Sequence, residues 1–386
     1  MKLCNECHKA FPDDATRCPD HGEQLKPDSL LGKTLGGFQI TDWLGEGGMG
    51  VLYKARHEVI GRKAAVKVIK GEYITDSRMA GRFEQEARTV ARIGHPHLID
   101  IFDIGTTPDG RLYYVMELLE GRALASRIAH ERPDFQTFAA LLIDSCQALE
   151  AAHAVNIVHR DLKPDNIFLV ERPGEPPFAK VLDFGIAKVL GMDEDVQKKL
   201  TKTGSIIGTP AYMAPEQIKG GKIDSRADIY ALGVILYELC VGRPPFVSET
   251  MGALLVAHLL EATPAWADLT DARIAPGVPA EMEAVCARAL AKNPDDRYQT
   301  VGELREDLER VVAARGDRPV LADDADEHGV RWPRDVADPR SGVGAVGGQG
   351  ELDHRGLGLA ELEDPHQVAD AHRLLDEGGH QPRRRH

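Results

Sequence analysis

The chain has 386 residues, 42% of them hydrophobic, so it is long enough for one large domain with appendages. Its 47 basic and 61 acidic residues give a formal net charge of -14, which argues against a nucleic-acid partner. The six cysteines show no disulfide-framework pattern, and the sequence has neither the apolar core of a signal peptide nor the roughly 18 apolar residues of a membrane span. We therefore expect a cytoplasmic protein without a membrane partner.

Two pairs of metal-ligand residues lie within residues 1–25. The predicted ligands are Cys4, Cys7, Cys18 and His21. Two residues separate the ligands of each pair, ten residues separate the pairs, and thiolates with an imidazole suit tetrahedral Zn²⁺. The segment resembles a small zinc ribbon. Two alternatives stay open: His8 as the fourth ligand, and an unstructured tail with incidental cysteines.

Composition and periodicity divide the rest of the chain. Residues 26–37 contain the proline and glycines of a linker. Over 38–117, short apolar segments between glycine turns predict a strand-rich lobe around one helix at 77–93. Over 122–313, apolar residues recur at helical spacing and predict a helical lobe. Residues 314–386 lack lysine and are poor in apolar residues, which predicts a disordered tail and leaves open whether its reading frame is genuine.

A glycine-rich loop joins the first two predicted strands. Residues 45–50 read Gly-Glu-Gly-Gly-Met-Gly, and glycines there allow backbone N–H groups to approach phosphate oxygens. A plain hairpin turn is the alternative, whereas a dinucleotide fingerprint is disfavoured because residues 51–55 read as a strand and not as a helix. Further on, Lys67 interrupts an apolar strand and needs a partner or a ligand, and Glu86 on the following helix can supply the partner.

Three further motifs complete the pattern. They are His159-Arg-Asp-Leu-Lys-Pro-Asp-Asn166, Asp183-Phe-Gly185 and Ala214-Pro-Glu216. With the glycine loop and Lys67 they resemble the eukaryotic-like, bacterial-type serine/threonine protein kinases over residues 38–313. The resemblance implies a two-lobed α+β kinase fold behind the zinc ribbon, and a signalling enzyme that transfers the γ-phosphate of ATP to protein Ser/Thr hydroxyls with Mg²⁺ or Mn²⁺.

The resemblance also implies a role for each matched residue. Asp161 is expected to accept the proton of the substrate hydroxyl, and Lys163 to contact the γ-phosphate. Lys67 is expected to hold the α- and β-phosphates while paired with Glu86. The expected nucleotide-site residues are Leu44, Gly45, Glu46, Gly47, Gly48, Met49, Gly50, Leu52, Ala65, Lys67, Met116, Glu117, Leu119, Asn166 and Asp183. Asn166 and Asp183 are the expected magnesium ligands, with Met116 as gatekeeper and Glu117 to Leu119 as hinge.

Other matched residues are expected to support the site. Asp228 resembles a buried aspartate that braces the catalytic loop, and Arg297 resembles the partner of Glu216. Thr201 and Thr203 resemble paired regulatory phosphosites. We expect their modification in trans, through a transient kinase–kinase dimer, with the phosphates docking on Arg160.

Two rival functions remain at the level of sequence. One is a pseudokinase that binds nucleotide without turnover, and the other is a zinc-ribbon adaptor with a regulatory kinase domain. The intact set of Lys67, Asp161, Asn166 and Asp183 argues against the first.

Overall fold

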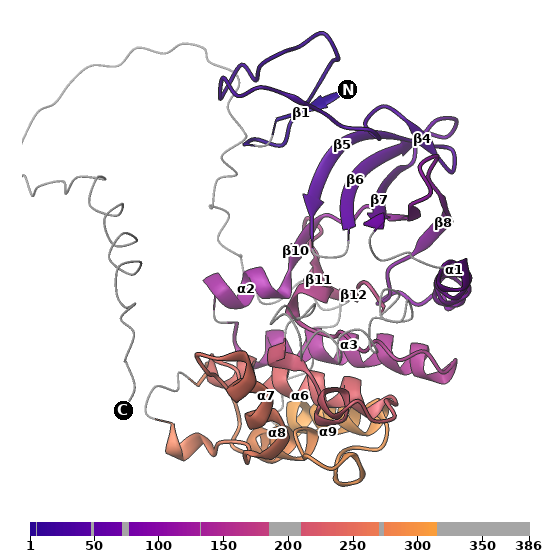
Figure 1. Ribbon diagram of the computed structural model, residues 1–386. Helices are drawn as coiled ribbons and strands as arrows, with labels where there is room; N and C mark the ends of the chain where they lie inside the picture. Colours follow the sequence, from indigo (N-terminus) through magenta and orange to yellow (C-terminus); the bar gives the residue numbers. More distant parts are fainter. Residues whose placement is uncertain are drawn as a thin grey trace, which may run out of the picture. The chain divides into compact units, whose positions relative to one another are not determined.

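The computed structural model describes residues 1–4, 6–47, 50–71, 77–131, 133–184, 210–269 and 274–314, all within the unit Met1–Gly329 (Figure 1). Gly48, Met49, Thr201, Thr203 and the predicted tail beyond Ala314 therefore lie outside the described residues.

The first residues form a small sheet of their own. Its strands are β1 (Lys2–Leu3), β2 (Ala10–Phe11) and β3 (Lys26–Pro27), in the order β2-β1-β3. Cys4, Cys18 and Leu25 bury their side chains together beneath it. A core this small buries little apolar surface, and Leu3 and Ala10 of this sheet also pack against the apolar cluster of the next sheet.

Residues 26–37, which we expected to be a linker, are part of the packed structure. Strand β3 lies in the N-terminal sheet, and β4 (Thr34–Leu35) pairs with the first long strand of the next sheet. Leu30, Leu31 and Leu35 are buried in the same cluster as the inner side chains of that sheet. The linker signals, proline and glycine, mark turns between these contacts.

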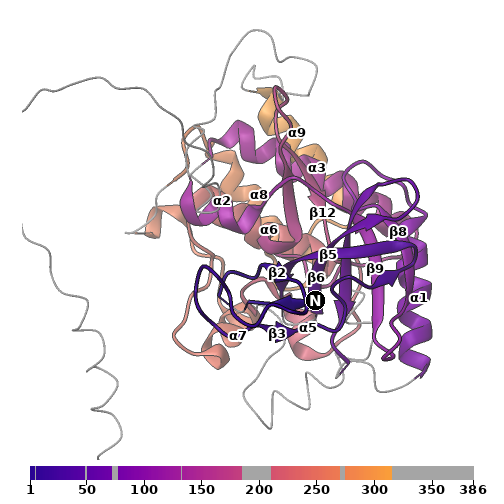
Figure 2. The same cartoon turned by 90° about the horizontal axis from the view of Figure 1, so that it is seen from above.

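A six-stranded antiparallel sheet follows, in the order β4-β5-β6-β7-β9-β8. Its longer strands are β5 (Phe38–Glu46), β6 (Gly50–His57), β7 (Lys63–Ile69), β8 (Ile101–Thr106) and β9 (Leu112–Glu117). The single helix α1 (Ser77–Ala91) lies alongside β8 (Figure 2). This is the predicted strand-rich lobe.

The second lobe is helical, as predicted (Figure 1). Its helices are α2 (Leu124–His130), α3 (Phe135–Ala154), α5 (Pro215–Lys219), α6 (Arg226–Val241), α7 (Met251–Leu260), α8 (Glu281–Ala289) and α9 (Val301–Ala314). Helix α6 is buried on nearly every side. Gly233 allows α8 to approach it closely, because a Cβ at that position would lie 2.8 Å from the Cβ of Ala289 on α8. The described part of the chain contains no helix that is both long and apolar enough to cross a membrane.

Three short strands connect the two lobes at the expected site. They are β10 (Gly121–Ala123), β11 (Ile167–Val170) and β12 (Phe178–Val181), in that order in one antiparallel sheet. Short 3-10 turns occur at Pro164–Asn166, Pro210–Tyr212, Trp266–Asp268 and Pro294–Asp296. Strand β11 begins directly after the motif that contains Asp161, and only Leu182 separates the end of β12 from Asp183, so the hairpin brings the two carboxylates to one place.

Candidate active site

Asp183 is held by two side chains from the strand-rich lobe. Lys67 of β7 and Tyr114 of β9 are directly paired across the sheet, so they project from the same face. The Lys67 Nζ lies 2.6 Å from Asp183 Oδ2, and the Tyr114 hydroxyl donates to Oδ1 at 2.5 Å. Burial opposes ionisation of Asp183, but the Lys67 charge and these hydrogen bonds outweigh it and lower its pKa.

The predicted Lys67–Glu86 ion pair is not formed in this structure. Within the described part of the chain, Lys67 pairs with Asp183, and Glu86 on α1 makes no ion pair. Burial raises the pKa of Glu86 to about 7, and the nearby charge of Arg160 offsets only part of that rise. The pKa of Asp183 is lowered by its contact with Lys67, whereas Glu86, without that contact, keeps a raised pKa.

The catalytic loop, residues 159–166, is anchored by Asp228 of α6. The Asp228 carboxylate accepts the backbone N–H groups of His159 and Arg160 at 2.8 Å each, and His153 Nε2 lies 2.8 Å from it. Burial raises the pKa of Asp228, but these hydrogen bonds and the two histidines lower it by more. The two amide bonds hold Arg160 at a φ of 64°, a conformation that non-glycine residues adopt only when their surroundings enforce it.

The loop gathers the predicted catalytic residues. Lys163 Nζ lies 3.5 Å from Asp161 Oδ2, and Asn166 Nδ2 donates to the backbone oxygen of Asp161 at 2.7 Å. The N–H of Leu182 donates to the Asn166 backbone oxygen at 2.8 Å, which places Asp183, the next residue, beside the loop. No described residue hydrogen-bonds to the side-chain oxygen of Asn166. An amide oxygen and a carboxylate are hard ligands that suit Mg²⁺.

A buried ion pair supports the loop from the helical lobe. The Arg297 guanidinium is almost wholly buried and makes two 2.8 Å contacts with the Glu216 carboxylate. The neighbouring Gln217 donates to the backbone oxygen of Arg160 at 2.7 Å, so the pair is linked to the catalytic loop. The expected partnership of Arg297 with Glu216 and the bracing role of Asp228 are thus both seen.

The glycines of residues 45–50 serve different purposes. Gly50 must be glycine because a Cβ there would lie 2.4 Å from the backbone oxygen of Val68 on β7. Gly47 donates to the Gly50 oxygen at 2.9 Å and closes the turn. Gly45 and Gly47 have open space where a Cβ would be, which leaves room for a ligand to approach the backbone. Leu44 just before the loop is largely exposed, whereas Leu52 just after it is half-buried.

The remaining predicted nucleotide-site residues lie on β7, on β9 and just after β9. Ala65 and Met116 are buried and directly paired across β7 and β9. The Glu117 N–H donates to the Asp100 backbone oxygen at 3.0 Å. The Glu117 carboxylate lies 2.5 Å from Lys180 Nζ. Among the described residues, the backbone groups of Leu119 make no hydrogen bond, so they can pair with a base.

The predicted zinc ligands form one cluster. The ligand atoms of Cys4, Cys7, Cys18 and His21 all lie within 4.8 Å of one another. Cys7 and Cys18 have their sulfurs 3.7 Å apart, and Cys18 Sγ lies 3.5 Å from His21 Nδ1. Zn–S and Zn–N bonds of about 2.3 and 2.0–2.1 Å at tetrahedral angles place such atoms about 3.8 and about 3.5 Å apart. These two distances are compatible with a zinc ion, and the cluster contains His21 and does not contain His8.

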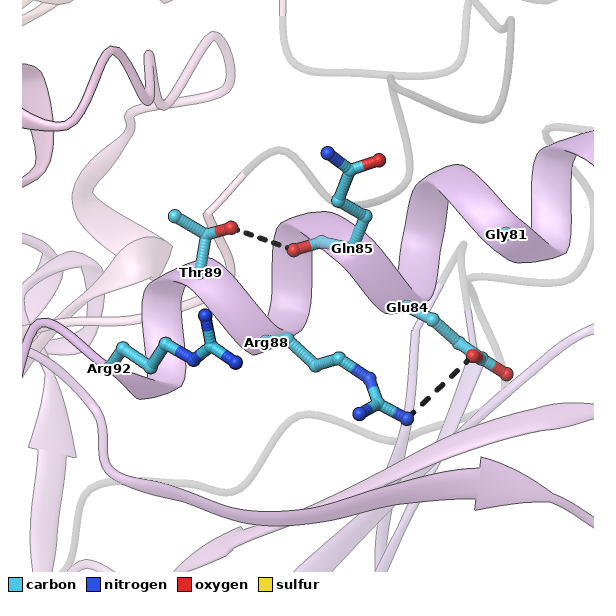
Figure 3. A pocket seen from close by; sticks show the side chains of 6 residues that line it. All are labelled: Gly81, Glu84, Gln85, Arg88, Thr89 and Arg92. Carbon is cyan, nitrogen blue, oxygen red and sulfur yellow. Dashed lines mark hydrogen bonds and ion pairs between the residues drawn. The ribbon is translucent and has the colours of Figure 1, made fainter.

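A hollow of about 370 Å³ runs along the outer face of α1 (Figure 3). Its lining residues are Gly81, Glu84, Gln85, Arg88, Thr89 and Arg92. Five of the six belong to α1 and Arg92 directly follows it, and the Thr89 hydroxyl donates to the Gln85 backbone oxygen at 2.8 Å. None of the predicted nucleotide-site residues lines it, so we assign the hollow to the solvent face of the helix.

Some residues of the site could not have been found by motif. Tyr114 looks like any aromatic strand residue, and its bond to Asp183 depends on its pairing with Lys67 across the sheet. His153 falls at the end of the amphipathic helix α3, where its imidazole reads as a surface group, yet it contacts Asp228. In both cases the only sequence signal is a polar atom within an otherwise apolar pattern.

A strand-rich lobe, a helical lobe, and a lysine, two aspartates and an asparagine gathered between them define a protein kinase fold and site. The protein kinase domain family matches residues 38–307, and the chain belongs to that family. The predicted two-lobed fold is thereby confirmed.

Curated relatives show which branch of the family is similar. The chain is 46% identical over 286 residues to serine/threonine-protein kinase Pkn1 of Myxococcus xanthus, covering 74% of this chain and 40% of that one. It is 38% identical over 294 residues to PknB of Mycolicibacterium smegmatis, covering 75% and 45%. Both relatives are named as serine/threonine-protein kinases, and this chain spans about half the length of these relatives.

A solved structure agrees with the fold. The kinase domain of Mycobacterium tuberculosis PknI superposes with a TM-score of 0.57 at 26% identity, covering 73% of this chain and 98% of that one. The similarity concerns the kinase lobes.

Proposed function

We propose that this protein transfers the γ-phosphate of ATP to serine or threonine hydroxyls of protein substrates. The main support is that Asp161, Lys163 and Asn166 lie on one loop beside Asp183. Lys67 of the other lobe contacts Asp183. Phosphoryl transfer calls for positioning and charge neutralisation more than for covalent chemistry, and this set supplies both.

Each residue has a role that follows from its surroundings. Asp161 is partly exposed and carries a carboxylate that can accept the proton of an incoming hydroxyl. Lys163, 3.5 Å away, supplies a cation on the same side, where charge moves during transfer. Asn166 and Asp183 offer the oxygens that would hold Mg²⁺, and the metal would neutralise phosphate charge when bound.

A single substitution tests the proposal against a pseudokinase. We expect the wild type to transfer radiolabelled phosphate from ATP to a protein substrate, and Asp161→Asn to lose about 100-fold or more of that rate. Asp165→Asn is the matched control, because Asp165 is exposed on the same loop and should leave the rate unchanged. Equal rates in the wild type and Asp161→Asn would refute the assignment.

The proposal includes activation by autophosphorylation in trans at Thr201 and Thr203, within a transient kinase–kinase dimer. Its support is that Arg160 lies near enough to the half-buried Glu86 to lower its pKa, because phosphates on the segment could compete for that guanidinium. We expect the Thr201→Ala, Thr203→Ala double variant to phosphorylate substrate more slowly than Ser205→Ala. Mass spectra of active enzyme without phosphate at either threonine would contradict this mechanism.

The proposal also includes one structural Zn²⁺ per chain, held by Cys4, Cys7, Cys18 and His21. Its support is the gathering of the four ligand atoms within 4.8 Å of one another, with the Cys7–Cys18 and Cys18–His21 distances close to those of a tetrahedral zinc site. Metal analysis should find about one zinc per chain in the wild type and much less in His21→Ala. A cytoplasmic location is part of the same proposal, because thiolate ligands persist in a reducing compartment. Full-length protein purified without zinc would overturn the metal site.

A further inference from the structure

The two halves of the predicted zinc site are built alike. In the first, the N–H that follows Cys7 belongs to His8 and donates to the Cys4 oxygen at 2.9 Å. In the second, the N–H that follows His21 belongs to Gly22 and donates to the Cys18 oxygen at 2.8 Å. His8 and Gly22 therefore occupy equivalent positions, each one residue past the second ligand.

That position requires a left-handed backbone. The φ angles are 54° at His8 and 65° at Gly22, a region that glycine adopts freely and a histidine adopts at a cost. A glycine at position 8 would thus suit the metal site better. Since His8 is also absent from the ligand cluster, the metal site gives no reason for a histidine there.

The His8 ring has a partner in the kinase domain. It stacks on Trp43 of β5 with 4.0 Å between ring centroids and 19° between ring planes. Leu3 and Ala10 of the N-terminal sheet pack against the same apolar cluster as Trp43, so the stack lies within a continuous contact between the two parts.

Trp43 lies near the end of β5, next to the glycine-rich loop. It directly precedes Leu44 and Gly45, where β5 runs into the glycine-rich loop. The pairing of β5 with β6 shifts its register between Trp43 and Gly45 and then resumes, so the direction in which the strand enters the loop is set beside Trp43. A side chain stacked on Trp43 is therefore placed to set where the loop begins.

We propose that His8 is a positioning residue for nucleotide binding, which couples the metal-organised N-terminal segment to the glycine-rich loop through Trp43. This rests on the proposed nucleotide and zinc sites. In the metal-bound segment the Cys4–Cys7 turn fixes the His8 backbone, the ring braces Trp43, and the loop is held in its binding position. Deleting residues 1–25 would then impair nucleotide affinity, although the sequence alone suggests a separable appendage.

His8→Gly separates this role from metal binding. The substitution gives the turn the residue already present at position 22, so the full-length variant should keep its zinc and its melting temperature. We expect its Kd for a fluorescent ATP analogue with Mg²⁺, and its KM for ATP, to rise about 3–10-fold, the range expected for one aromatic contact, with kcat unchanged. His8→Phe should restore most of the affinity because it restores the stacked ring.

Two further measurements complete the test. Removing zinc from the wild type with a chelator should weaken analogue binding to the level of His8→Gly, and should have little further effect on that variant. Lys9→Ala is the control, because it breaks only an exposed contact with Asp20 and should bind the analogue like the wild type.

Each result has a definite meaning. Unchanged analogue affinity in zinc-loaded His8→Gly would overturn the proposal, and so would loss of zinc from that variant, since His8 would then serve the metal site itself. Because the readout is nucleotide binding, a protein that binds the analogue but transfers no phosphate would refute the kinase assignment and leave the coupling standing.

Discussion

The two sides of the candidate active site are held in different ways. On the helical side, buried Asp228 fixes two backbone amides and a histidine, and the catalytic loop needs no ligand to keep its shape. On the strand-rich side, Lys67 has taken Asp183 as its partner while Glu86 stays unpaired among the described residues. The catalytic loop on the helical side is therefore preorganised. The strand-rich side, in contrast, has ionic contacts that a bound nucleotide must rearrange.

The largest effect should come from removing the anchor of the preorganised side. Asp228→Ala leaves two buried amides and His153 without their acceptor, and should cost about 3–5 kcal/mol of unfolding free energy in urea titrations. Because folding lowers the pKa of Asp228, its contribution is present above about pH 4 and is lost as the pH falls further. The control Asp224→Ala breaks a partly exposed pair and should cost about 1 kcal/mol or less. Similar losses in both variants would remove the contrast between the two sides.

Next in size is the loss of the cation on the nucleotide side. Lys67→Met should lower phosphate transfer by about 100-fold or more, because the ammonium that orients phosphates is gone. The variant should remain folded, because Lys67 contributes charge and not core packing, and Asp183 can bind a proton once its counter-ion is lost. Lys63→Met, an exposed change on the same strand, is the control for steady-state rates. A variant that unfolds, or one that transfers phosphate normally, would contradict this division of roles.

The carboxylate of Glu86, which has no ion pair among the described residues, should make the melting temperature depend on pH. Folding raises the pKa of Glu86 to about 7, so the folded protein binds this proton more tightly than the unfolded chain does. The resulting contribution to the free energy of unfolding is fully present below about pH 4.5 and is lost as the pH rises through 7. Glu86→Gln should therefore melt about 2–6 °C above the wild type at pH 8 without nucleotide, and close to it at pH 4.5. Its transfer activity should fall, because no ion pair with Lys67 can form.

Glu84→Gln provides the matched control on the same helix. Glu84 lies on the outer face of α1, 4.0 Å from Arg88 (Figure 3), and should show no such pH-dependent difference. If Glu86→Gln melts like the wild type at both pH values, Glu86 is not desolvated in the nucleotide-free protein.

The smallest effect should come from Tyr114. Its hydroxyl occupies one oxygen of Asp183, so Tyr114→Phe frees that oxygen for a metal. We expect half-saturation with Mg²⁺ to occur at about threefold lower concentration in transfer assays, a modest change because Lys67 still holds the other oxygen. A higher magnesium requirement would instead show that the tyrosine orients Asp183 for the metal.

The motifs along the chain were enough to predict which kinds of groups form the site and in what order they occur. Asp161, Asn166 and Asp183 could be assigned because each lies in a short motif whose local turn or hairpin fixes its direction. The paired spacing of Cys4, Cys7, Cys18 and His21 likewise encodes the metal-ligand cluster locally, within two tight turns. The two lobes followed from periodicity, because strand and helix repeats are properties of neighbouring residues.

Which of these groups contact one another depends on how the separate segments pack. Lys67 and Asp183 are 116 residues apart, and whether the lysine selects that aspartate or Glu86 depends on how α1 packs and how much water each carboxylate loses. The stacking of His8 on Trp43 and the burial of Leu30 are likewise contacts between separate segments. Such pairings depend on burial and on competition between distant charges, and no local pattern of residues records either quantity.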